Sequence, residues 1–170
     1  MTGPSDLTPP RAGRSRAEAL VSSYVRWEGR PPVRLGPTGD VTFGAYGFRH
    51  ESATDTLVGR VFIERAWDAG ADEPTRALTG RMFQALIDPR IGGMFDHGGG
   101  EFHLDEERRA IFLLRRFDVA STSEHQFRVA MEHLRNVGAT WTLHWYFRVA
   151  RILHGWDPPP RVYTSWPPAK

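Results

Sequence analysis

The spacing of apolar residues at the start of the chain predicts a helix. Within residues 16–28, Leu20 and Tyr24 lie one helical turn apart, with further apolar positions beside them. Ser15 followed by Glu18 has the spacing of a capping box, which places the start of the helix here. Glycine and proline residues directly after the segment end it.

A β region follows the first helix. Short strands are predicted over residues 33–35, 41–48 and 57–63, where β-branched and aromatic residues are frequent. In the second of these, Val41 and Phe43 alternate with Thr and Gly. A Gly-Pro-Thr-Gly-Asp sequence and a polar stretch separate the segments, as turns do between antiparallel strands. The region therefore reads as a meander of two or three strands.

A second helix and a hairpin come next. The helical stripe over residues 73–87 is closed by an Asp-Pro pair, because the residue before a proline disfavours helical geometry. Residues 101–104 and 110–117 then form two strands joined by a charged turn. Alternation along the first strand predicts that Phe102 and Leu104 face the core.

The last predicted element is a long helix that starts near Ser121 or Ser123 and reaches His154. Its apolar residues recur in steps of three and four throughout. Unbroken, it would be roughly 50 Å long, against a width of roughly 30 Å for a small domain. We therefore expect it to kink, split or project, and residues 136–138, Asn-Val-Gly, are where a break costs least.

The predicted order is α-β-β-β-α-β-β-α. This is an α+β fold with an antiparallel sheet of about five strands flanked by helices. Residues 1–14 are expected to be a disordered leader, residues 15–154 a single domain, and residues 155–170 an extended tail rich in Pro and Trp. The leader lacks the apolar region of a signal peptide, and the apolar runs are too short for a membrane span. A cytoplasmic location is expected.

Charge and composition remove several function classes. The 170 residues include 22 Lys and Arg against 20 Asp and Glu, and no Cys, which excludes disulfides, thiolate metal sites and cysteine nucleophiles. The net charge of +2 disfavours a nucleic-acid binder, which usually carries a clustered basic excess, so that reading is a third hypothesis. The densest basic group is Arg108, Arg109, Arg115 and Arg116, of which the last two should point to opposite faces of a strand.

No catalytic constellation is evident in the sequence. It contains neither a Gly-x-Ser-x-Gly elbow nor an HExxH motif, so a non-enzymatic protein without a cofactor is expected. One alternative stays open, a small-ligand or divalent-metal site. Its nitrogen and oxygen ligands would come from the loop and strand that carry Asp96, His97, Glu101 and His103.

Aromatic residues are concentrated at the C-terminal end, where four of the six Trp residues lie in the last 30 positions. Such side chains anchor interfaces because each buries a large area at low entropic cost. The overlong helix and the tail are therefore a candidate partner or homodimer surface. Its candidate contacts are Trp141, Trp145, Phe147, Trp156, Tyr163 and Trp166. Alternatively, Trp141 and Trp145 simply pack on the sheet.

The order of elements resembles a known fold. Gly92-Gly93-Met94-Phe95, then the acidic segment 101–107 and the apolar segment 110–114, stand where class I type III secretion chaperones place a loop, a strand, a turn and a strand. The chain is also similar in this respect to the related YbjN-like family of bacterial proteins. The resemblance implies a cytoplasmic, non-enzymatic homodimer that holds a client peptide along apolar patches. Those chaperones are typically acidic, whereas this chain is slightly basic.

Overall fold

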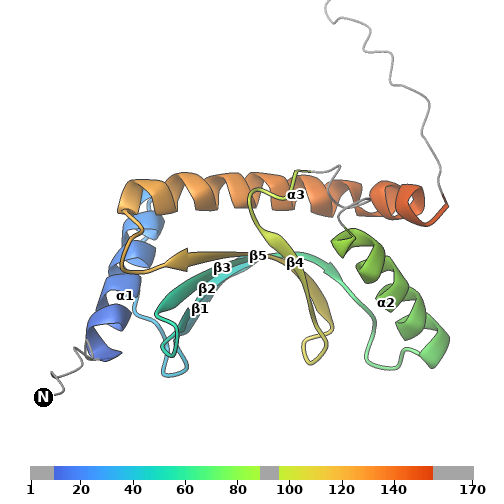
Figure 1. Ribbon diagram of the computed structural model, residues 1–170, viewed down its shortest axis with the longest axis horizontal. Coiled ribbons are helices and arrows are strands. Elements are labelled where there is room, and N and C mark those ends of the chain that lie inside the picture. The colour runs from blue at the N-terminus through green and yellow to red at the C-terminus, as the bar shows by residue number, and fades with distance from the viewer. Residues whose placement is uncertain (1–9, 89–95, 155–170) are drawn as a thin grey trace, which may run out of the picture.

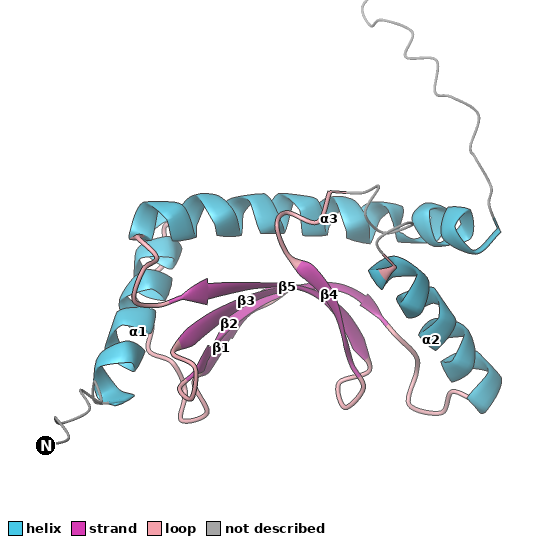
Figure 2. Cartoon of the chain, in the orientation of Figure 1, coloured by secondary structure: helices cyan, strands magenta, loops and turns pink. Residues whose placement is uncertain are grey.

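Five strands and three helices make up the part of the chain that the computed structural model describes, residues 10–88 and 96–154 (Figures 1 and 2). In chain order they are α1 (Pro10–Trp27), β1 (Asp40–Phe43), β2 (Tyr46–Glu51), β3 (Thr56–Arg65), α2 (Glu73–Ile87), β4 (Glu101–Asp105), β5 (Ala110–Asp118) and α3 (Glu124–His154). The predicted tail and residues 1–9 of the predicted leader lie outside the described residues.

The strands form one antiparallel sheet in the order β1-β2-β3-β5-β4. The predicted α+β class and the predicted order of elements are therefore confirmed. Figure 1 shows α3 lying along one face of the sheet, with α1 at one end of that helix and α2 at the other. We call this side the covered face, and it carries Phe48, Val61 and Leu113. The opposite side, the open face, carries Arg49, Arg60, Phe112 and Arg116.

The count of three strands in the first β region is right, but their assignment is partly wrong. Residues 33–35 are not a strand: the hydroxyl of Ser22 bonds the backbone of Val33, and Glu18 accepts from the Leu35 amide at 3.2 Å. The predicted strand 41–48 is two strands, because Gly44, with φ of 63°, starts a turn after Phe43.

The first helix begins at Pro10, earlier than the predicted start at residue 16, and Ser15 lies within it rather than at its cap. Proline is well suited to a first helical turn, which the prediction of a disordered leader overlooked. Gly13 lets this turn approach the β2–β3 turn, since a Cβ there would collide with the carboxylate of Asp55. In addition, Arg14 donates to the carbonyls of Leu35 and Gly36 at 2.7 Å each.

The C-terminal helix α3 starts after Ser123, one of the two predicted starting positions, with a capping box. The Ser123 hydroxyl accepts from the Gln126 amide at 3.2 Å, and the Gln126 side chain accepts from the Ser123 amide at 3.0 Å. Of the alternatives expected for this long helix, a split at residues 136–138 does not occur, because α3 is continuous over 31 residues. Gly138 serves close packing instead: a Cβ there would lie 2.6 Å from Val61.

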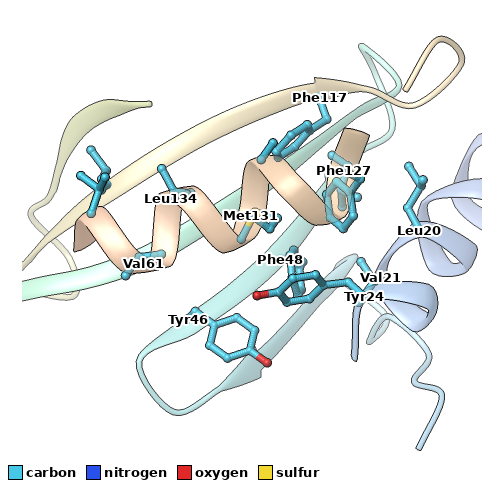
Figure 3. Packing of buried hydrophobic residues seen from close by; sticks show 14 of the residues in the cluster. Leu20, Val21, Tyr24, Tyr46, Phe48, Val61, Phe117, Phe127, Met131 and Leu134 are labelled. Atoms are coloured by element: carbon cyan, nitrogen blue, oxygen red, sulfur yellow. The ribbon is translucent and has the colours of Figure 1, made fainter. Parts of the chain in front are cut away.

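The core lies between α3, α1 and the covered face. Figure 3 shows its aromatic end, where Phe127 of α3 meets Tyr24 of α1 and Phe48 of β2. The ring of Tyr24 stands edge-on to those of Phe48 and Phe127, at 5.8 and 6.1 Å between centroids. Edge-to-face pairs of this kind add to the stabilisation from burial itself. The core thus fixes α1 and α3 to the same end of the sheet.

Candidate protein-binding surfaces

Trp141 belongs to the core and offers no area to a partner. Its side chain is 0% exposed, and its ring stands edge-on to Phe102 of β4 at 4.8 Å. The indole nitrogen donates to the Asp96 carbonyl at 3.1 Å, so the polar edge of the ring is satisfied within the chain. The prediction that Trp141 contacts a partner is therefore corrected, and the alternative, that it packs on the sheet, holds.

The other five predicted contacts stay predictions. Trp145 and Phe147 lie on α3, but the described side chains of this helix end before them. Trp156, Tyr163 and Trp166 lie outside the described residues.

The four candidate metal ligands do not form a shared donor set. Asp96 pairs with His133 of α3 at 3.4 Å, and Glu101 pairs with Arg116 across the strands. His97 lies against the rings of Phe102 and Trp141, whereas His103 is exposed on the open face. In the described ranges, no three His, Asp or Glu side chains are close enough together to hold a metal ion.

The basic group is divided between the two faces, as predicted. Arg115 lies on the covered side, where it donates to the Gly98 carbonyl at 2.8 Å. Arg116 lies on the open face with Glu101, and Arg108 pairs with Asp105 at 3.8 Å. Arg109 is in the turn, with φ of 53°. These arginines therefore do not make one continuous basic patch of the kind that binds nucleic acid.

A groove runs between the end of β5 and the start of α3. β3 pairs with the whole of β5, but β4 pairs only with Ala110–Leu114. Within the described part of the chain, residues 115–118 thus have a strand neighbour on one side only. An edge of this kind presents backbone donors and acceptors to which another strand can pair. The hollow beside it has a volume of about 590 Å³.

We call this hollow the β5–α3 groove, and its lining is mixed. Phe117 and Ala130 provide an apolar floor, and Val129, which is 50% exposed, is an unusually open apolar side chain. The remaining lining residues are polar or charged: Arg115, Ser121, Thr122, His125, Gln126 and His133. Apolar pockets beside a free strand edge are the combination that strand addition uses, with side chains for specificity and backbone bonds for affinity.

The open face carries a second hollow, centred on Arg60 of β3. It has a volume of about 560 Å³, and we call it the Arg60 hollow; it is lined by Thr42, Arg60, Phe62, Arg108 and Phe112, among others. The rings of Phe62 and Phe112 stand edge-on at 5.9 Å. The Arg60 guanidinium lies 5.8 Å from the centre of the Phe112 ring and donates to the Thr42 hydroxyl at 3.2 Å. Burial lowers the pKa of Arg60, and the nearby Arg108 lowers it further.

A third hollow, of about 480 Å³, adjoins α3 and we call it the Leu143 hollow. Val61, Ala139 and Leu143 line it, and Leu143 is 79% exposed. The Leu143 and Arg60 hollows share Ala45, Tyr46 and Phe62. The two hollows therefore make one elongated surface that passes the β1–β2 turn.

Sequence reasoning missed Val129, Arg60 and Leu143. Arg60 did leave a signal, because it is a single charged residue inside an otherwise apolar and β-branched strand. Val129 and Leu143 also left a signal, because they lie two positions after Phe127 and Trp141 of the apolar stripe and therefore on the opposite side of the helix.

Comparisons with known proteins bear on the fold alone. No protein-family model matches the sequence, and no curated protein matches it. Of the described helices, none has the length and apolar character needed to cross a membrane. The structure is similar to a chain in the solved structure of the HopA1-SchA chaperone-effector complex, with a TM-score of 0.53 and 14% identity over 82% of this chain and 99% of that one. At the level of the fold, this confirms the resemblance to type III secretion chaperones that the order of elements indicated.

Proposed function

We propose that this chain is a non-enzymatic, chaperone-like protein that binds another polypeptide. The observation that carries the proposal is the β5–α3 groove, in which a free strand edge adjoins a hollow with an apolar floor. A client segment would add as a strand beside residues 115–118 and place alternate side chains in the groove. The similarity to a chain of a chaperone–effector complex supports a role of this type.

The proposal extends to a homodimer located in the cytoplasm. Two apolar side chains on opposite sides of α2, Leu78 and Ile87, are 43% and 46% exposed, and either side of this helix would provide a contact between copies of the chain. Light scattering on the purified full chain tests this part: a dimer that Leu78→Glu with Ile87→Glu converts to a monomer supports it. A monomer at all concentrations rejects the dimer and leaves client binding open.

Client binding is tested by capture followed by reconstitution. The tagged full chain is used to capture proteins from its native host, and each captured protein is then purified and titrated against the chain. We expect Val129→Glu to weaken the complex at least about tenfold, because a carboxylate would be buried against apolar surface.

Thr140→Glu is the matched control for that variant. It adds the same charge to an exposed position of α3 outside the hollows described above, and should leave affinity unchanged. Equal losses in the two variants, or the failure of every purified candidate to bind, would reject the proposal. Hydrogen exchange adds a direct readout, since an added strand must protect amides within residues 115–118.

A further inference from the structure

Arg60 differs from the other arginines of the open face in its partners. Arg49 lies 4.0 Å from Asp40, Arg108 lies 3.8 Å from Asp105, and Arg116 pairs with Glu101. Arg60 has the Thr42 hydroxyl and the Phe112 ring, and no described carboxylate lies within ion-pair distance of it. It is also half-buried, whereas Arg49 and Arg116 are exposed.

A half-buried cation with no carboxylate in contact is an unusual arrangement. Removing a charge from water is costly unless it is paired, and Arg60 has lost part of its hydration while Asp40 and Asp105, which pair with other arginines, act on it only from beyond ion-pair distance. The guanidinium presents several N–H donors in a planar fork, which suits a carboxylate better than any other common protein group. The second cation at the hollow, Arg108, favours the same sign of ligand.

The surroundings restrict what carries that carboxylate. Phe62 and Phe112 make apolar walls beside Arg60, so the anionic group should be attached to an apolar or extended body. The Leu143 hollow, reached past Ala45 and Tyr46, is lined by apolar groups of β3 and α3 together with three polar residues of α3, Arg135, Asn136 and Thr142. A compact anion would occupy one end of this surface, whereas an extended polypeptide can occupy both.

We propose that the Arg60 and Leu143 hollows form a second docking surface, which takes an acidic, apolar segment of a client polypeptide. A Glu or Asp side chain of the segment pairs with Arg60, and an apolar side chain enters the Leu143 hollow. The proposal rests on the proposed function in that the ligand is a polypeptide, but it uses a different face from the β5–α3 groove. The two sites can therefore fail independently.

The test is calorimetric titration of the full chain with two synthetic peptides. One repeats Leu-Ser-Glu-Ser, so that several registers can match the two hollows, and the other has Gln in place of Glu. We expect the Glu peptide to bind at least about tenfold more tightly, as one charge-assisted hydrogen bond gives. Arg60→Gln should abolish that preference, whereas Arg49→Gln, on the same face outside the hollow, should keep it. Leu143→Ser should weaken both peptides.

Several outcomes would overturn the proposal. These are equal binding of the two peptides, a preference that survives Arg60→Gln, and loss of the peptide in the groove variant Val129→Glu. Free glutarate binding as tightly as the Glu peptide, with Leu143→Ser having no effect, would mean a small-anion site instead. If Arg60→Gln lowers the melting temperature, the peptide affinity of Leu143→Ser is the test instead, because the exposed side chain of Leu143 contributes little to folding. If the chain prefers the Glu peptide but no client protein is found, the function proposed above is rejected and the second docking surface is retained.

Discussion

The two faces of the sheet are formed by the same strands, but their side chains are covered in different ways. On the covered face, Phe48, Val61 and Leu113 are buried and pack under α3 and α1. On the open face, arginines alternate with apolar residues, so that Val58 lies between Arg49 and Arg116. The arginine stems can cover apolar surface while their charges stay at the surface.

The difference shows how burial can be achieved with or without a covering helix. The covered face needs close fit, which small residues provide: Gly59 lies under Met131, and Gly138 lies over Val61. The open face needs no such fit, and it therefore keeps hollows in which another molecule can pack. The stability of the fold should depend on the covered face, whereas the open face should contribute to binding at the Arg60 hollow more than to stability.

The largest effect is expected from the core at the covered face. Trp141→Ala should lower the free energy of unfolding by about 3–5 kcal/mol, since it removes a fully buried ring and its bond to the Asp96 carbonyl. Urea unfolding measures it. Trp27→Ala is the control, because Trp27 is 49% exposed and should cost much less. Similar losses in both variants would mean that burial under α3 is not what stabilises the fold.

Glycine substitutions should change stability in opposite directions at two positions. Gly59→Val places a side chain against the sulfur of Met131 and should lower the free energy of unfolding by about 1–3 kcal/mol. Gly80→Ala, in α2, meets no atom within 4 Å and should raise it by about 0.5–1 kcal/mol. Thermal unfolding of both variants tests the pair, and a stabilised Gly59→Val would refute close packing under α3.

A smaller loss of stability is expected at alkaline pH. Burial raises the pKa of Tyr24 and of Tyr46 above the ordinary value of 10.0, although Arg135 opposes this at Tyr24. Because the folded state resists ionisation, its full stability is present below about pH 10 and is lost as the pH rises further. Urea unfolding at several alkaline pH values should show that the free energy of unfolding falls less steeply with pH in the double variant Tyr24→Phe with Tyr46→Phe than in the unchanged protein. Equal slopes in the two proteins would contradict it.

The smallest change in stability is expected from a substitution on the open face. Arg116→Gln breaks the pair with Glu101, whose two side chains are 50% and 62% exposed, and should change stability by less than about 0.5 kcal/mol. Chemical unfolding with and without added salt measures this. A loss comparable to that of Gly59→Val would show that the open face contributes to folding, and the contrast between the faces would then be much weaker.

The elements with strong local signals were predicted closely from the sequence. The bounds of α2 match those predicted, and the capping box of Ser123 and Gln126 marks the start of α3. Alternation along β4 correctly predicted that Phe102 and Leu104 face the core. Elements with weak signals were less well predicted: residues 33–35 lack a strand partner, and α1 begins in a stretch whose prolines suggested disorder.

The amino-acid sequence alone determined the fold class, the order of elements and the long apolar stripe of α3, because these follow from local spacing and turn residues. Only the tertiary structure decided which residues are available for binding. Trp141 and Leu143 lie on opposite sides of α3, as their two-residue spacing implies, but only the packing of this helix on the sheet makes one side buried and leaves Leu143 79% exposed. Likewise, β4 ends before β5 does, and that difference in length, which depends on pairing between distant segments, leaves the edge beside the β5–α3 groove. Exposure depends on what packs opposite a residue, and local spacing does not encode that.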